Sequence, residues 1–172
     1  MIEPKPIFAQ GFFTVSRRGD FFQIVRFDYY DPEHYYEKVM KSPILYDEEM
    51  RKLAYNMQRM LDLEEVLVNS IRVRPKVRMV NIEHSGFSDA PHITFLIYFK
   101  GSLRKGVNTF EDKYESETIE YDYEVYWFFP PKTRIVEVEM SGDIDVIDNI
   151  LYVWARRGDK IKGYEKIVFE FY

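Results

Sequence analysis

The sequence predicts an α+β fold, with a mainly antiparallel, twisted sheet and two or three packed helices in a single domain that spans residues 1–172. Two observations favour this class. Several runs alternate apolar and polar residues with the period of half-buried strands, and other segments repeat apolar residues every three or four positions, as amphipathic helices do. The predicted order of elements is ββ-αα-ββββ-α-β. Closure of the sheet into a barrel is an open alternative.

The chain begins with a predicted hairpin and a short helix. Two strand-like runs lie within residues 8–30, and Gly19 between them can adopt the positive φ that a tight turn requires. Asp31 can accept hydrogen bonds from the free N–H groups of a helix that starts at Pro32 and runs to about residue 41. Pro43 is expected to end that helix.

A second helix is expected from Asp47 to about Val68, because acidic residues occupy its first turn and apolar residues recur at helical spacing. The apolar stripe consists of Met50, Leu53, Met57, Met60, Leu61, Leu67 and Val68. The segment 62–70 contains no Gly or Pro, so it fits either the end of the helix or the beginning of a strand.

Four strand-like runs then suggest an antiparallel meander with one buried face. These runs are residues 71–79, 92–100, 117–129 and 134–140. Pro75 cannot donate a hydrogen bond to a neighbouring strand, so the first run is expected at a sheet edge or with a bulge. The segment 101–108 is expected to be a polar loop.

A helix is predicted over residues 146–155, with a cap at Asp143 or Asp145 and an end near Gly158, although its apolar core also fits a strand. A final strand is predicted over residues 164–172.

The composition excludes several classes of protein. With 24 Lys and Arg against 29 Asp and Glu, the formal charge of −5 opposes binding to nucleic acid. The absence of cysteine excludes disulfides, thiolate nucleophiles and Cys-ligated metals. No membrane span or signal peptide is recognised, so a cytoplasmic protein is expected. The charge content and the lack of cysteine also resemble proteins from hot environments.

No complete catalytic motif is present. His92-Ile93-Thr94 resembles one half of the paired H-x-T signature of two-histidine phosphoesterases, which implies that His92 contacts a phosphate. The second half is missing, because neither His34 nor His84 has a hydroxyl residue two positions later. The alternative interpretation is that the His92 ring has only a structural role, with a hydrogen bond to a neighbouring carbonyl or water.

Charged residues form rows at the spacing of a strand. The cations are Arg72, Arg74, Lys76 and Arg78, and the acids are Glu120, Asp122, Glu124, Glu137 and Glu139. In one interpretation these rows face solvent and form cross-strand pairs. In the other they face each other inside a barrel, where the cations bind phosphate and Glu137 and Glu139 bind Mg²⁺.

The segment Glu137-Val138-Glu139 is similar to the start of the E-x-E-x-K signature of triphosphate tunnel enzymes, in which the acidic pair holds a divalent metal. This chain departs from that signature at Ser141, where the family has lysine.

Aromatic residues make up 17% of the chain, and many are adjacent, so their rings point to opposite faces of a strand and cannot all enter one core. Helices, a subunit interface or a ligand pocket must cover the remainder. Helix cover is the first expectation and a homodimer the second.

Three functions follow from these patterns. The first hypothesis is a non-catalytic binding or interaction module that uses no cofactor and binds a protein or a small molecule. The second is a metal-dependent enzyme that acts on a phosphate ester or nucleotide through the charged rows. The third is a carrier of a small hydrophobic ligand, because the order of elements resembles the helix-grip arrangement of START-like domains, which implies a ligand between sheet and helix.

Overall fold

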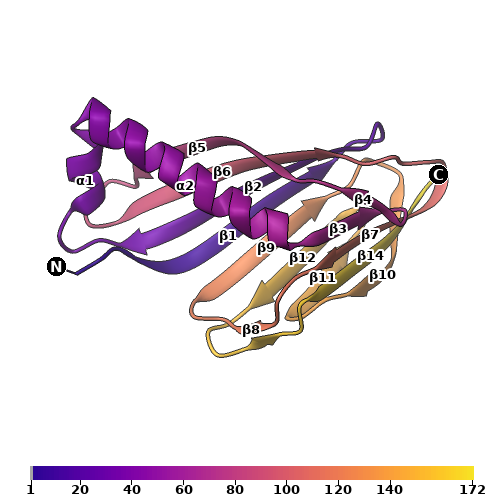
Figure 1. The fold of residues 1–172 in the computed structure, drawn as a ribbon. Coiled ribbons are helices and arrows are strands. Elements are labelled where there is room, and N and C mark those ends of the chain that lie inside the picture. Colours follow the sequence, from indigo (N-terminus) through magenta and orange to yellow (C-terminus); the bar gives the residue numbers. More distant parts are fainter. Residues whose placement is uncertain (1) are drawn as a thin grey trace.

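A computed structural model describes residues 2–172 (Figure 1). The helices are α1 (Tyr35–Met40) and α2 (Pro43–Leu63). The larger sheet contains, in spatial order, β11 (Asp143–Ile147), β12 (Ile150–Ala155), β9 (Asp122–Phe128), β1 (Lys5–Val15), β2 (Asp20–Tyr30), β6 (Pro91–Lys100) and β5 (Lys76–His84).

A second sheet contains β10 (Thr133–Glu139), β14 (Tyr164–Phe171), β7 (Gly106–Lys113), β3 (Glu65–Val68) and β4 (Ile71–Val73), again in spatial order. A short ribbon joins β8 (Glu117–Thr118) to β13 (Lys160–Ile161). Neighbouring strands are antiparallel except for β1 and β9, which are parallel. The predicted α+β class with mainly antiparallel pairing is therefore confirmed. The predicted order of elements is not, and the described strands form open sheets rather than a closed barrel.

The hairpin of β1 and β2 is formed as predicted, with Gly19 at a φ of 83°. A Cβ atom at this position would lie 1.9 Å from the carbonyl oxygen of Gly101. The backbone N–H of Gly101 donates to the Gly19 carbonyl at 2.8 Å, so the turn packs closely against the end of β6. Glycine is therefore required at this position both for its backbone angle and for the space.

The helix boundaries differ from those predicted. Asp31 caps α1, as expected, but the helix begins at Tyr35 rather than Pro32. Pro43 starts α2 instead of only ending α1, because the Ser42 side chain accepts from the N–H of Leu45 and so caps a helix whose first residue is the proline. Helix α2 ends at Leu63, and residues 65–68 form β3.

The predicted meander is wrong in its connections. The predicted loop 101–108 is too long, because its last three residues begin β7 (Gly106–Lys113), in which Asn108 and Phe110 are the buried residues. Strand β9 lies parallel to β1 in the larger sheet, whereas β10 pairs with β14 in the other. The break at Pro75 separates β4 from β5, both of which are edge strands, as the missing donor suggested.

The predicted helix over residues 146–155 is a hairpin of β11 and β12. Asp148 has a φ of 53° and, with Asn149, forms a two-residue turn. Leu151, Val153 and Ala155 are buried alternately, which is the period of a strand. The final strand is confirmed as β14.

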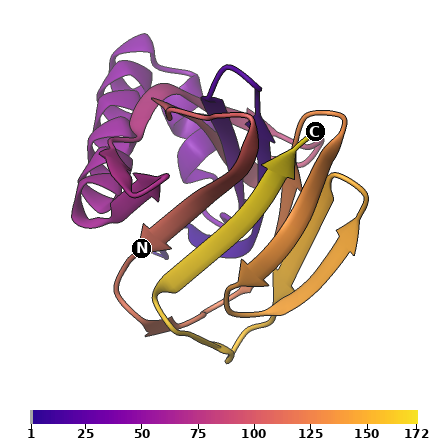
Figure 2. The ribbon, with the colours of Figure 1, turned by 90° about the vertical axis from the view of Figure 1, so that its right-hand side faces the viewer.

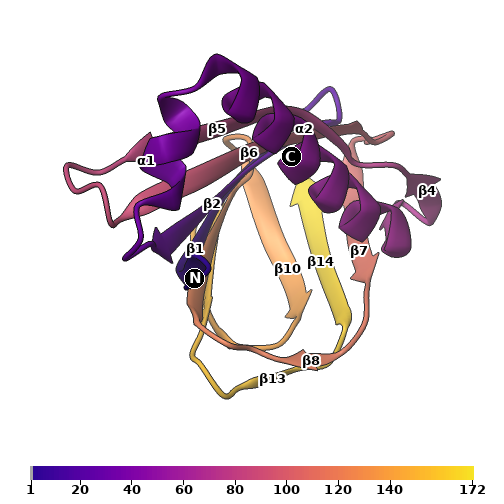
Figure 3. The same cartoon turned by 60° about the vertical axis from the view of Figure 1, so that its left-hand side comes forward.

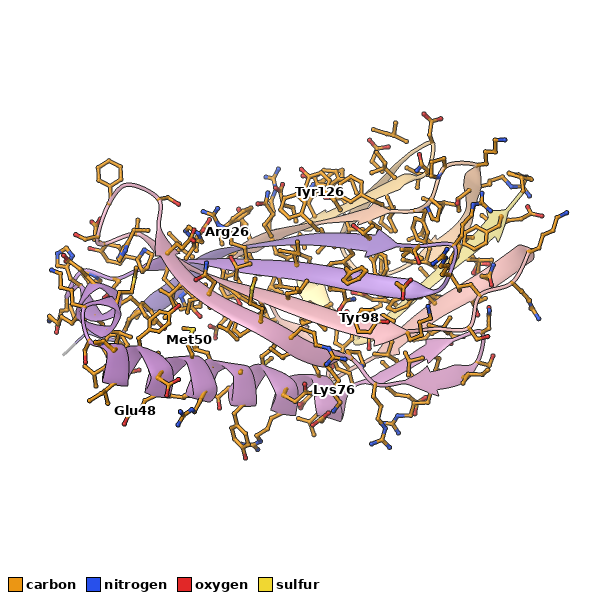
Figure 4. All side chains as sticks on the ribbon, turned by 90° about the horizontal axis from the view of Figure 1, so that it is seen from above. Arg26, Glu48, Met50, Lys76, Tyr98 and Tyr126 are labelled. Carbon is orange, nitrogen blue, oxygen red and sulfur yellow. The ribbon has the colours of Figure 1, made fainter. Side chains whose placement is uncertain are left out.

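Helix α2 and the five-stranded sheet cover the same face of the seven-stranded sheet, here called the inner face (Figure 3). Figure 2 shows the purple helix beside the second sheet, whose strand β14 is yellow. In Figure 4, Met50 points from α2 toward the strands and Glu48 points away from them. Among residues 2–172, no helix is long and apolar enough to cross a lipid bilayer.

The first testable prediction concerns the cap of α1. Asp31 is fully buried, and its carboxylate accepts from the N–H groups of Tyr35 at 3.0 Å and Tyr36 at 2.9 Å. Asp31→Ala leaves one buried and one part-buried donor without this partner, so we expect the free energy of unfolding to fall by about 2 kcal/mol, as measured by urea denaturation. The control Asp47→Ala removes only an exposed pair with Arg51 and should cost less than about 0.5 kcal/mol. Equal losses in both variants would contradict the capping role.

Candidate ligand-binding cavity

A cavity of about 290 Å³ lies where α2, the two sheets and the β8–β13 ribbon meet. The strand period determines its floor, because alternate residues of the larger sheet point to the inner face: Gln23, Val25 and Phe27 of β2 line it, as do Tyr123, Val125 and Trp127 of β9. The helix period determines its roof, since Met57, Met60, Leu61 and Glu64 follow one another at helical spacing. The lining is therefore mostly apolar and aromatic.

The cavity reaches solvent beside the end of α2. Met60 lines it and has 62% of its surface exposed, and Glu117 of β8 also lines it and is exposed. Trp127, in contrast, lies at the floor and is only 2% exposed. A ligand could thus enter between α2 and the β8–β13 ribbon without unfolding either layer.

Four acidic side chains line the otherwise mostly apolar cavity: the exposed Glu117 at its opening, and the less exposed Glu64, Asp112 and Glu165. Asp112 of β7 and Glu165 of β14 are directly opposite each other in the antiparallel ladder, so their side chains stand next to each other on one face. Glu64 is the residue that follows α2, and its side chain reaches the same space from the helix side. The fold therefore brings together three carboxyl groups from three elements.

The hydrogen bonds of these carboxyls are incomplete. The Tyr114 hydroxyl donates to Oε1 of Glu165 at 2.9 Å and orients that carboxyl. Within the described part of the chain, Oδ1 of Asp112 is buried and has no hydrogen-bond partner. The residues that line the cavity include no lysine, arginine or histidine. No cation of the lining therefore balances the carboxyls, and Arg72, in the adjoining groove, donates to the backbone carbonyl of Glu64 at 3.4 Å.

Burial raises the pKa of each of these carboxyls, and the charges of neighbouring acids raise the pKa of Asp112 and Glu64 further. Burial, followed by the nearby charges of Glu64 and Glu165, raises the pKa of Asp112 to about 8. Burial and the charge of Glu165 raise the pKa of Glu64 to about 7, and burial also raises the pKa of Glu165. The pKa of Tyr114 is raised by burial and by Glu165, so its hydroxyl stays a donor. The cavity can consequently hold or exchange a proton near neutral pH.

Some of the phosphate-binding residues predicted from the sequence do share a surface. Arg72, Arg74 and Lys76 line a groove of about 400 Å³ next to the cavity, and Glu64 and Leu61 line both. Lys76 lies 3.6 Å from the Asp62 carboxylate in that groove. Arg78 is elsewhere, because its guanidinium lies 5.5 Å from the ring centre of Tyr98 on the outer face of the larger sheet.

His92 and the predicted metal ligands lie far from this groove. His92 contacts the Ser85 hydroxyl at 3.1 Å, and burial with the Arg26 charge lowers its pKa. Glu137 and Glu139 are on β10, at the opposite edge of the five-stranded sheet from Arg72, and Glu137 pairs with Lys166 at 3.3 Å. Within residues 2–172, no cluster of three His, Asp or Glu side chains could hold a metal ion. The structure therefore does not bring the basic and acidic rows together.

The cavity acids were missed at the level of sequence, although two signals existed. Glu165 shares the parity of the buried residues Ile167, Phe169 and Phe171 on β14, which places it on the inner face. Glu64 continues the helical spacing of Met57 and Leu61. Asp112 gave no such signal, because the sequence predicts a loop over residues 101–108 and no element for the residues that follow it, including Asp112.

Comparison with known proteins gives no family for this chain: no protein-family model matches the sequence, and no curated protein is significantly similar to it. The function must therefore be inferred from the cavity itself.

The raised pKa values give the second prediction. The folded protein keeps protons that the unfolded chain releases near pH 4, so these groups make the free energy of unfolding fall as pH rises toward about 8. Each retained proton contributes a slope of about 1.4 kcal/mol per pH unit in that window. Asp112→Asn should therefore flatten the fall measured by denaturation between about pH 5 and 8.

The control for this prediction is Glu139→Gln, which changes an exposed acid and should leave the pH dependence unchanged. An Asp112→Asn protein with the same pH dependence as the unmodified chain would show that Asp112 loses its proton as an ordinary surface carboxyl does.

Proposed function

We propose that this protein binds a small, largely apolar molecule in the cavity between α2 and the two sheets. The observation that carries this proposal is the mostly apolar, ring-lined cavity that opens beside Met60. Binding sites for small molecules are commonly concave and apolar, with a few polar groups that orient the ligand. This proposal combines two hypotheses drawn from the sequence. One is a binding module without a catalytic motif, and the other is a carrier that holds its ligand between sheet and helix.

The size of the cavity limits the ligand. An apolar cavity of about 150 Å³ accommodates benzene in another protein, so the volume of about 290 Å³ suits a molecule of roughly two rings or a short branched chain. The three methionines in the lining, Met57, Met60 and Met140, can adjust their rotamers to ligands of different shape.

A metal-dependent enzyme has less support. Its basic row lies at the β4 edge of the second sheet and in the adjoining groove, whereas Glu137 and Glu139 lie at the β10 edge. A phosphate held by the first group would not reach a metal held by the second.

The third prediction tests cavity binding with a neutral fluorescent probe, N-phenyl-naphthylamine. Trp154→Phe leaves Trp127, in the cavity floor, as the single tryptophan, so energy transfer from Trp127 reports a probe bound nearby. In this background, Val25→Trp fills the cavity, so we expect the affinity for the probe to fall roughly tenfold or more. Because this variant adds a second tryptophan, its binding is measured by probe fluorescence alone.

The matched control is Ile24→Trp, which adds the same side chain to the outer face of the same strand, where Ile24 is 42% exposed. It should leave the probe affinity unchanged. Saturable binding that survives Val25→Trp but not Ile24→Trp would place the ligand outside the cavity.

We also propose that a second copy of the chain covers the outer face of the larger sheet. The rings of Phe12, Tyr126, Tyr152 and Trp154 stack across three strands on this face, with centroids 5.4, 4.6 and 4.8 Å apart in that order. In Figure 4, Tyr126 lies on the side of the sheet opposite α2. Neither helix covers these rings, and their flat, rigid surface suits the core of an interface.

The fourth prediction follows from this surface. The unmodified chain should have the mass of a dimer in light scattering, and Tyr126→Glu should reduce it to that of a monomer, because a charge at the centre of an apolar interface is costly to bury. Val136→Glu, which alters an apolar residue on β10 that is 49% exposed, serves as the control and should stay dimeric. A monomeric unmodified protein would contradict the proposal.

A further inference from the structure

The charges inside the cavity differ from those on the rest of the second sheet. On the outer face, acids are paired across strands: Lys113 lies 3.0 Å from Glu65, and Arg134 lies 2.7 Å from Glu170. On the inner face, the directly opposite pair is Asp112 with Glu165, two acids. Like charges in this position destabilise a sheet. The same strands therefore follow the usual pairing rule on one face and break it on the face that lines the cavity.

Among residues 2–172, every other titratable group that lines the cavity with Asp112 is also acidic or phenolic. These groups are Glu64 from the end of α2, Glu117 from β8, Tyr123 from β9, Glu165 from β14 and Tyr114, which directly follows β7. The nearest cations in sequence, Lys113 and Lys166, project to the other face and pair with Glu65 and Glu137. No side chain of the lining can supply the missing positive charge.

The buried carboxyl oxygens indicate which kind of ligand group could supply the missing positive charge. Oδ1 of Asp112 is enclosed and has no hydrogen-bond partner, while Tyr114 already orients the Glu165 carboxyl beside it. An ammonium group has three donors and no acceptor, so it can bond to several carboxylates at once. Burial of a charge is tolerated when it is both paired and hydrogen-bonded.

We propose that the ligand is an amphipathic amine, whose protonated nitrogen lies at the opposed pair Asp112 and Glu165 and whose apolar body packs on Trp127, Val125 and Met57. This inference rests on the proposed function, since it specifies the ligand of the same cavity. It also specifies a direction: the nitrogen lies toward β7 and β14, and the body lies toward α2 and the larger sheet.

Binding of the amine replaces a proton on one carboxyl with the ammonium group of the ligand. In the empty cavity at neutral pH, a carboxyl retains its proton; when the ammonium group binds, that carboxyl ionises, its O–H bond breaks and the proton passes to the buffer. The ammonium keeps all of its own protons. Binding of an amine should therefore release up to one proton, whereas binding of an uncharged molecule should release none.

The fifth prediction uses three ligands of one shape: naphthylmethylamine, naphthylmethanol and naphthoate. Each competes with N-phenyl-naphthylamine for the unmodified protein at neutral pH. We expect the amine to bind roughly tenfold or more tighter than the alcohol, because charge-assisted hydrogen bonds are stronger than neutral ones, and the carboxylate to bind weakest. Calorimetry in two buffers of different ionisation enthalpy should show proton release for the amine alone.

Two variants separate the charge from the shape of the site. Asp112→Asn keeps the volume of the side chain and should weaken the amine roughly tenfold while it leaves the alcohol unchanged. Glu111→Gln alters the neighbouring residue of β7, which faces the other side and accepts from the Tyr164 hydroxyl, and should change neither ligand. Retained far-UV circular dichroism verifies that both variants are folded.

The outcomes distinguish the two proposals. Equal or tighter binding of the alcohol or the carboxylate would overturn the amine inference and leave the proposed function intact. Failure of the fluorescent probe and of all three ligands to bind would overturn both. An amine preference that persists in Asp112→Asn without proton release would also refute the inference, because the cation would then lie away from these carboxyls.

Discussion

The inner face of the seven-stranded sheet is the constraint on which the rest of the structure depends. Its alternate residues are apolar and must be covered, but seven strands spaced about 4.8 Å apart span roughly 30 Å, whereas one helix is about 10–12 Å wide. Helix α2 therefore covers only the part formed by β5 and by one end of β2 and of β6; Phe21 and Phe99, toward the other ends of β2 and β6, pack in the core of the second sheet. The five-stranded sheet covers those ends together with β1, β9 and β12. The cavity lies along the junction, where a round helix and a flat sheet meet side by side over a third surface.

This junction also explains the position of the acids. Glu64, the residue that follows α2, and Asp112 and Glu165, at one end of the β7–β14 pair, lie where neither cover is complete and line the same cavity as the exposed Met60. Farther along the same two strands, Phe110 and Ile167 are opposite each other and fully enclosed. The change from acids to apolar residues along one ladder follows the change from an open to a closed part of the core.

The sequence predicted local structure better than the pairing of strands that are distant in the chain. Gly19, Asp31 and the apolar alternation of β14 each depend on residues close in the chain, and each was placed correctly. The segment 146–155 was mistaken for a helix because Asp148, which forms the turn, is a weaker signal than glycine. The parallel contact of β9 with β1 joins residues more than a hundred positions apart, and no local pattern carries that information. The cavity depends on these long-range contacts, which is why its acids were not foreseen as a group.

Repulsion between Asp112 and Glu165 is therefore a cost that the fold accepts at one place, while the outer faces of the same strands carry opposite charges in register. Local rules that a sequence otherwise follows are most often broken at functional sites, where stability is exchanged for binding or chemistry. The same repulsion lowers the affinity of the cavity for anions and raises it for cations. Two contributions would thus favour binding of a cationic ligand: contact with the apolar walls and relief of the charge repulsion. The stability lost in the empty protein would reappear as binding free energy.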